Sequence, residues 1–200
     1  MSILLAACAQ PQQAAREPSA LDVIMTRTSI RSFTGDAVSQ EQLETILKAG
    51  MAAPSAINIQ PWKFVVLTDK ARIEELFGGK GPRSGMFTTA GAVIIVCGET
   101  TGMRKPWGQP DAPETEQENK FWFEDCSAAA ENILLAAHAI GLGAVWTAGW
   151  PAEERIAPIQ EALGIPANVK PLCVIPVGVP AENPEPKDKW KPENIHWEKW

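Results

Sequence analysis

The sequence predicts an α+β domain in which helices cover both faces of a sheet. Residues 92–97 form a continuous apolar run of strand length, which is typical of a strand buried on both faces. Helical apolar spacing occurs before and after this run, over 39–50, 69–77 and 121–140. A chain of 200 residues that is 45% hydrophobic and 21% charged has enough apolar material for one such core. We therefore expect a single globular domain.

The first eighteen residues read as a tether that precedes a domain over 19–200. Leu5-Ala6-Ala7-Cys8 is similar to the lipid-attachment box of a bacterial lipoprotein signal, and an Ala-, Gln- and Pro-rich stretch follows it. No Lys or Arg precedes the apolar run, which is also shorter than the about 7 to 15 residues of a signal peptide. Two interpretations stay open: an envelope protein lipidated at Cys8, which is the only route to a membrane, or an accidental match in a cytoplasmic protein.

The elements of the domain follow from caps and spacing. Ser19 can cap a short helix that ends at Arg27, and Ser39 with Gln42 forms a capping box for the next helix. The remaining segments are predicted, in chain order, as a strand over 62–68, a helix over 69–77, a strand over 92–97, a surface excursion without apolar period over 101–118, a helix over 121–140, a short strand over 143–147, a helix that ends at 163 and a strand over 170–178.

A stiff polar connector spans residues 53–62. Pro54 and Pro61 fix their own φ angles and push the residue before each toward an extended conformation. Ser55 and Asn58 therefore present donors and acceptors that suit the polar edge of a flat heteroaromatic ring. A rigid connector whose polar groups only cap neighbouring backbone is an equally open interpretation.

A basic segment follows the first helix. Arg27, Thr28, Ser29 and Arg31 could converge on a phosphate, because guanidinium and hydroxyl donors match its oxygens and arginine can bind in bidentate fashion. The alternative is a solvated basic turn.

Composition and spacing exclude several classes of protein. A net charge of −6 and a pI near 5.0 argue against nucleic acid as the main partner. Cys8, Cys97, Cys126 and Cys173 have no short paired spacing, so neither a disulfide framework nor a zinc site is expected. No glycine-rich nucleotide loop follows a strand, and the chain has only two histidines. An enzyme with so few acid–base groups would rely on a bound cofactor.

Four segments, in their order and spacing, resemble the FMN-dependent nitroreductase family: Arg27-Thr28-Ser29-Ile30-Arg31-Ser32-Phe33, the Pro- and Asn-containing connector over 53–62, Gly141-Leu142-Gly143, and the tail from Lys187 to Trp200. The resemblance covers the chain from about Leu21 onward. It implies a three-layer α-β-α sandwich around a mixed, mainly antiparallel sheet. It also implies an intertwined homodimer in which residues 180–200 form an arm that wraps the partner subunit.

The resemblance implies a set of FMN-binding residues. Those that would hold the phosphate are Arg27, Thr28, Ser29, Arg31, Lys187 and Lys189. Those that would border the ring are Pro54, Ser55, Ala56 and Asn58 across the dimer interface, and the backbone of Ala148 and Gly149 near N5. No side chain is expected to act as a catalytic acid or base, because N5 carries the chemistry. No metal is expected.

The reaction implied is that of an NAD(P)H oxidoreductase. NADH or NADPH would reduce the flavin, and a small nitroaromatic or quinone-type acceptor would then reoxidise it by a ping-pong mechanism. Trp107 and Trp122 are expected to form an aromatic wall of the substrate pocket, with ordinary packing as the alternative. Thr28 and Lys189 depart from the family pattern, in which basic residues and arginine are more usual at these places.

Two other functions remain open from the sequence. One is a flavin-binding protein of the same fold with another reaction, such as reductive dehalogenation or flavin fragmentation. The other is a non-catalytic envelope lipoprotein, which requires acylation of Cys8.

Overall fold

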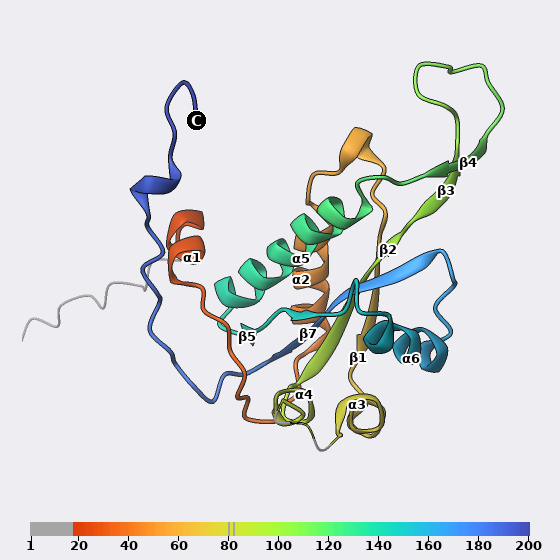
Figure 1. Ribbon diagram of the computed structural model, residues 1–200. Helices are drawn as coiled ribbons and strands as arrows, with labels where there is room; N and C mark the ends of the chain where they lie inside the picture. The colour runs from red at the N-terminus through yellow and green to blue at the C-terminus, as the bar shows by residue number, and fades with distance from the viewer. Residues whose placement is uncertain (1–17, 80, 82) are drawn as a thin grey trace, which may run out of the picture.

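The computed structural model describes residues 18–79, 81 and 83–200 of the chain, and the lipoprotein-like box with Cys8 lies outside them. Figure 1 shows the arrangement of the elements. In chain order these are α1 (Ala20–Thr26), α2 (Gln40–Met51), η1 (Ala56–Asn58), β1 (Trp62–Leu67), α3 (Lys70–Phe77), α4 (Gly85–Thr88), β2 (Ala92–Glu99), β3 (Thr101–Arg104), β4 (Thr115–Glu118), α5 (Trp122–Ala139), β5 (Gly143–Ala144), β6 (Thr147–Ala148), α6 (Glu153–Leu163), β7 (Val169–Gly178) and η2 (Pro192–Asn194).

The main sheet has five strands in the order β1-β2-β7-β5, and β6 also pairs with β7. Every pairing within the described part of the chain is antiparallel. β2 is central, with β1 on one side and β7 on the other, and its pairing with β7 covers its whole length. Every residue of the apolar run over 92–97 is buried, as the sequence predicted.

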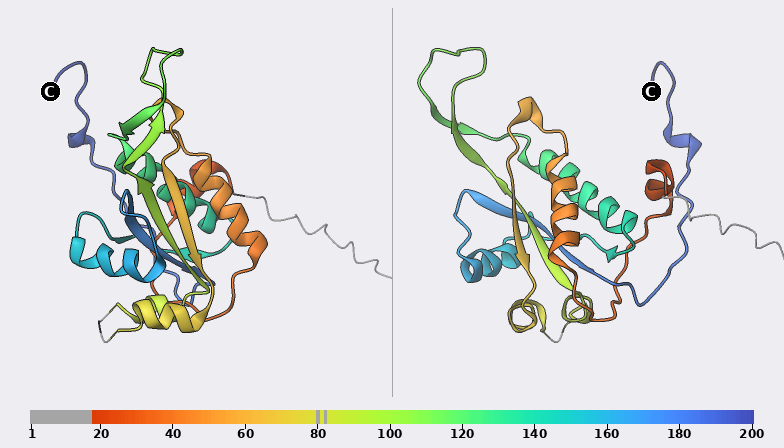
Figure 2. Two further views of the ribbon diagram at one scale, coloured as in Figure 1. Left: turned by 90° about the vertical axis from the view of Figure 1, so that its right-hand side faces the viewer. Right: turned by 180° about the vertical axis from the view of Figure 1, so that it is seen from behind.

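Alternate residues of β2 enter two separate cores. Ala92, Ile94 and Val96 join the core formed with α2 and α5, whereas Val93, Ile95 and Cys97 join the core formed with Ile73 of α3 and Ile159 of α6. Helices thus cover both faces of the sheet (Figure 1, Figure 2). The predicted three-layer α-β-α sandwich is confirmed.

The local predictions for helix ends are confirmed. Ser19 with Asp22 and Ser39 with Gln42 form capping boxes at the starts of α1 and α2. Asp69 caps α3 by accepting a hydrogen bond from the amide of Ala71. Each capping residue and its partner are two or three residues apart in sequence, so the starts of these helices could be predicted without knowledge of the fold.

The surface excursion predicted over 101–118 contains a hairpin that the sequence did not predict, in which β3 and β4 pair. Polar side chains hold its base. The guanidinium of Arg104 donates to the carbonyl of Glu118 at 2.7 Å and to the amide oxygen of Asn119, which is 1% exposed. The amide group of Asn119 donates in turn to the carbonyl of Glu99 at 2.7 Å. A hairpin stabilised in this way has no apolar period to detect.

The cysteines that the structure describes are free, as predicted. Cys97, Cys126 and Cys173 are buried. Burial raises the pKa of Cys97 and of Cys126 to about 12, so both thiols stay protonated at neutral pH. In the described ranges, no helix combines the length and apolar character that crossing a bilayer requires.

The chain after β7 leaves the body of the molecule. Its first residues pair with the segment after α1: the amide of Thr34 donates to the carbonyl of Val179 at 3.0 Å, and the amide of Ala181 donates to the carbonyl of Ser32 at 2.9 Å. From residue 181 to residue 200 every residue is exposed, and the segment extends away from the sandwich (Figure 1, Figure 2). We call residues 180–200 the C-terminal arm.

Candidate functional site

One hollow brings together the two ends of the described chain. It has a volume of about 320 Å³ and is lined by Arg27, Thr28, Ser29, Arg31, Pro184, Glu185, Lys187 and Lys189. All six residues predicted to hold a phosphate are in this set. We call it the basic hollow.

Backbone hydrogen bonds hold the segment after α1 in place. The amide of Ile30 donates to the carbonyl of Ala144 in β5 at 3.1 Å, so the segment is fixed to the edge of the sheet. Gly143 permits this approach, because a Cβ atom there would lie 2.7 Å from the side chain of Ile30. The basic side chains are therefore presented from a fixed backbone.

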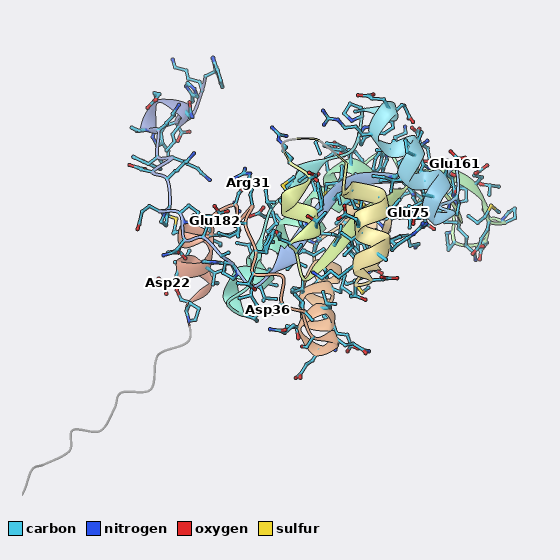
Figure 3. All side chains as sticks on the ribbon, turned by 90° about the horizontal axis from the view of Figure 1, so that it is seen from below. Asp22, Arg31, Asp36, Glu75, Glu161 and Glu182 are labelled. Carbon is cyan, nitrogen blue, oxygen red and sulfur yellow. The ribbon has the colours of Figure 1, made fainter. Side chains whose placement is uncertain are left out.

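Glu182 fastens the C-terminal arm to the same segment. Its carboxylate accepts hydrogen bonds from the amides of Arg31 and of Ser32, the latter at 3.1 Å. Figure 3 shows Glu182 beside Arg31, where the arm passes the body of the protein. Because Glu182 precedes Lys187 by only five residues, this contact delivers the arm lysines to the basic hollow.

The cations of the hollow differ in how they are paired. Nε of Arg27 lies 3.3 Å from Oε1 of Glu131 on α5, and the Arg27 side chain is 17% exposed. The guanidinium of Arg31 makes a long hydrogen bond of 3.4 Å to the carbonyl of Ser29 and has no carboxylate within 4 Å in the described residues. Arg31 is therefore free to bind an anion, and Arg27 is oriented by its partner.

A second hollow shares Arg31 and extends the site toward α4. It has a volume of about 310 Å³ and is lined by Arg31, Ser32, Arg83, Gly85, Met86 and Thr89. Two arginines and two hydroxyl-bearing residues line it, and no acidic residue does. The site thus continues from the basic hollow into a region that favours electron-rich oxygen or nitrogen atoms.

His138 lies close to the site and is hydrogen-bonded to α1. The hydroxyl of Thr26 donates to the carbonyl of Asp22 at 2.6 Å, so it accepts a hydrogen bond from Nε2–H of His138 at 2.9 Å. Burial and the nearby charge of Arg27 lower the pKa of His138. These contacts make His138 a hydrogen-bonded packing residue between α5 and α1.

The connector predicted to border the ring has an unusual backbone. Ile57, Asn58 and Gln60 have φ angles of 45°, 60° and 55°. Such angles cost free energy in residues other than glycine, most of all in a β-branched residue such as Ile57. The connector lies at the end of α2 beside the start of α5, away from the arm (Figure 1).

An open hollow of about 400 Å³ lies beside the connector. Its lining consists of Pro54, Ser55, Ala56, Phe121, Glu124, Asp125 and Ala128. None of these residues lines the basic hollow. Within one chain, the predicted phosphate residues and the predicted ring-edge residues are therefore in different places.

The flavin contact at the backbone of Ala148 and Gly149 stays a prediction, and one of the two amides has a partner within the chain. The amide of Gly149 donates to the carbonyl of Leu172 at 3.0 Å, so it is not free to donate to a ligand. Gly149 is required for this packing, because a Cβ atom would lie 2.9 Å from the carbonyl oxygen of Pro171. Ala148 is exposed and remains available as a contact.

The two tryptophans predicted for the substrate pocket have different environments. Trp122 is half-buried and packs edge-on against Trp150, with ring centroids 5.5 Å apart. It also lies over Gly98, where a Cβ atom would come within 2.5 Å of its ring. Trp107 is 79% exposed in the connection between β3 and β4. Neither lines the hollows described above, so within one chain their role in a substrate pocket remains a prediction.

The sequence reasoning did not identify three residues of the site. Asp125 lies on the buried face of α5, whose other residues are alanine, cysteine, isoleucine and leucine. A charged residue on an apolar helix face is a signal that the sequence itself carries. Glu182 and Arg83 lie in polar segments with many similar residues, so no local signal separates them from their neighbours.

Comparison with known proteins assigns the chain to a family. The profile of the nitroreductase family matches residues 24–79 and 77–179. A Methanothermobacter thermautotrophicus protein named as a candidate NADH dehydrogenase/NAD(P)H nitroreductase is 41% identical, over 90% of this chain and 87% of its own length. A crystal structure of a protein with the same candidate name from Bacteroides thetaiotaomicron is 40% identical, covers 90% of this chain and 98% of its own, and has a TM-score of 0.78. An FMN-dependent nitroreductase from Clostridium difficile is 25% identical, covers 90% of this chain and 99% of its own, and has a TM-score of 0.74. The chain belongs to the nitroreductase family.

Proposed function

We propose that this protein binds FMN and acts as an NAD(P)H oxidoreductase of the nitroreductase type, reducing small nitroaromatic or quinone-like acceptors. The observation that carries the proposal is the basic hollow. Four cationic side chains line one hollow: Arg27 and Arg31 come from the segment after α1, and Lys187 and Lys189 come from the C-terminal arm. These two segments are far apart in the sequence. In a protein of net charge −6, such a concentration of positive charge calls for an anionic ligand.

The residues of the hollow fit the phosphate of a mononucleotide. A phosphate monoester carries about −1.5 to −2 charges at neutral pH and offers three acceptor oxygens. Arg31, Lys187 and Lys189 supply cationic donors, and Thr28 and Ser29 supply hydroxyl donors. Glu185 also lines the hollow, and Glu131 pairs with Arg27, so these two carboxylates offset two of the four cationic charges. A bound phosphate would bring the site close to neutral.

The hollow that shares Arg31 fits the polar end of the isoalloxazine ring. The guanidinium of Arg83 and the hydroxyl of Thr89 would donate to ring carbonyl and nitrogen acceptors there. The Arg31 side chain borders both hollows, so a phosphate in one and a ring in the other would be held by one continuous wall. A positive group at this end of the ring favours the reduced, more electron-rich form of the cofactor.

The ring-edge residues would come from a second copy of the chain. Ser55 and Asn58 lie away from the basic hollow within one chain, so they can border the same ring only in a dimer. Exposed apolar side chains on α1 and on the C-terminal arm support this arrangement: Leu21 is 71% exposed, Trp197 79% and Trp200 98%. Large exposed apolar residues on α1 and on an extended arm favour burial against a partner subunit. The proposed form is a homodimer in which the C-terminal arm wraps the other subunit.

The bound FMN would supply the redox chemistry by accepting a hydride from NADH or NADPH at N5 and passing two electrons to the acceptor. The residues described above bind and orient it, and none of them is proposed as a catalytic acid or base. The same face of the ring would serve both substrates in turn, which is the basis for the proposed ping-pong kinetics. Trp107 and Trp122 stay candidates for contacts with a flat acceptor, in the assembled dimer.

The test combines cofactor binding with turnover. Purified protein is titrated with FMN, and binding is followed by quenching of flavin fluorescence. The loaded protein is then assayed for oxidation of NADH and NADPH with a panel of nitroaromatic and quinone acceptors. We expect a dissociation constant in the micromolar range or tighter and parallel-line kinetics. Protein that shows no saturable FMN binding would contradict the proposal.

A further inference from the structure

We propose that Asp125 is a positioning residue for the flavin: its carboxylate holds the amide of Ala56 so that residues 55–60 keep the conformation in which they border the ring. This inference rests on the proposed function. It assigns a role to a buried side chain on α5 that is not part of the phosphate site.

The connector needs an external anchor because its backbone is strained. Ile57, Asn58 and Gln60 all have φ angles in the left-handed region. Asparagine tolerates this region, but for Ile57 and Gln60 it is unfavourable, and such a conformation persists only where the surrounding structure holds it. Ile57 is also 56% exposed, so packing of its own side chain does not offset the cost.

Hydrogen bonds within the connector hold only part of its shape. The amide of Gln60 donates to the hydroxyl of Ser55 at 3.0 Å, and the amides of Asn58 and Ile59 donate to carbonyls of residues 55 and 56 at 3.0 and 3.1 Å. These bonds link the connector to itself, so they do not fix where it lies relative to the sandwich.

Asp125 makes the link to the sandwich. Its Oδ1 atom accepts a hydrogen bond from the amide of Ala56 at 3.0 Å. Among the described residues, it is the only group outside residues 55–60 that hydrogen-bonds to this stretch. Asp125 sits in the first turns of α5, the helix that packs against α2 and the sheet, so the anchor point is rigid.

The chemistry of Asp125 indicates a role other than stability. The residue is 7% exposed, and burial raises its pKa, with the hydrogen bond from Ala56 only partly opposing this effect. A buried carboxylate with one hydrogen bond costs stability relative to a neutral residue. It does provide a charge-assisted hydrogen bond, which is roughly twice as strong as a neutral one. A strong acceptor at this point suits a strained segment whose position matters.

The experiment compares FMN binding in Asp125→Ala, Asp125→Asn and Glu161→Ala. Asp125→Ala removes the acceptor, and Asp125→Asn keeps an acceptor oxygen without the charge. Glu161→Ala removes an exposed carboxylate on α6 that lines none of the hollows described above. We expect FMN to bind about tenfold more weakly to Asp125→Ala and about threefold more weakly to Asp125→Asn. Glu161→Ala is expected to bind FMN as the wild type does. Thermal unfolding without FMN is measured for each variant.

The outcomes separate this inference from the proposed function. If the wild type and Asp125→Ala bind FMN equally tightly, the positioning role alone is overturned. It is also overturned if Asp125→Asn binds FMN as weakly as Asp125→Ala does. A wild type that binds no FMN contradicts the proposed function itself. If Asp125→Ala does not fold, hydrogen exchange of the Ala56 amide in the wild type decides: slow exchange supports the anchor, and exchange at the rate of a free amide overturns it.

Discussion

The basic hollow makes a quantitative prediction about cofactor choice, because riboflavin differs from FMN only in lacking the phosphate. Lys187 and Lys189 line the hollow from the C-terminal arm, and both are exposed. Hydrogen bonds to charged groups contribute about 1.5–3 kcal/mol when shielded, and exposed ion pairs about 1 kcal/mol or less. Replacing both lysines with glutamine should therefore cost about 2 kcal/mol of FMN binding, which is about a 30-fold higher dissociation constant.

The assay measures dissociation constants for FMN and riboflavin with the wild type, the Lys187→Gln/Lys189→Gln variant and a Lys191→Gln control. Lys191 lies on the same exposed arm but does not line the hollow. Riboflavin affinity should be the same in all three proteins, and the preference for FMN should shrink as salt is added, because salt screens exposed charges. The reasoning is refuted if the double variant loses riboflavin as strongly as FMN, or if Lys191→Gln weakens FMN binding to the same extent.

Three further perturbations test other contacts. Glu182→Ala removes the acceptor for two backbone amides of the segment after α1. FMN affinity should fall about tenfold, and limited proteolysis of the C-terminal arm should become faster. An unchanged cleavage rate would contradict the role of Glu182 as an anchor of the arm. Ile57→Asn replaces an exposed β-branched residue at a φ of 45° with a residue that tolerates the left-handed region. Denaturant titration should therefore show a gain of about 1 kcal/mol in the free energy of unfolding. A loss would argue against strain in this backbone. Asp125 has a raised pKa in the folded protein, so as pH rises the unfolded chain loses this proton first, and the free energy of unfolding falls between the ordinary aspartate pKa and the raised one. Asp125→Asn does not titrate, so its free energy of unfolding should increase relative to that of the wild type across this window. A difference between the two proteins that is independent of pH would contradict this prediction.

The elements that could be read from the sequence share a physical property. The capping boxes at Ser19 and Ser39, the cap at Asp69 and the buried strand over 92–97 depend on residues that are close in the chain. Caps use partners two or three residues away, and helix and strand periods repeat within a few residues. Their structures follow from local chemistry, and the tertiary fold left them unchanged.

The hairpin over 101–118 was missed for a related reason. Its base is held by Arg104 and Asn119, which are 15 residues apart, and its strands carry no apolar alternation. Hydrophobic periodicity detects elements that bury a face, whereas this hairpin is stabilised by a polar network at its base. A strand of this kind can be assigned only when the strand with which it pairs is known.

By itself, the sequence determined the helices and strands whose caps and apolar period lie in neighbouring residues, and it named the basic segment after α1 as a candidate phosphate site. The three-layer sandwich and the arm lysines Lys187 and Lys189 were implied by the resemblance to a family. Only the tertiary structure decided that these segments meet in one hollow and how they are held there. Glu182 reaches the amide of Arg31 across 151 residues, and Asp125 reaches the amide of Ala56 across 69. Contacts over such separations depend on how the sheet and helices pack, since closing a long loop is entropically unfavourable until that packing offsets it. The sequence named candidate binding groups, and the fold determined which acidic residues hydrogen-bond to their backbone.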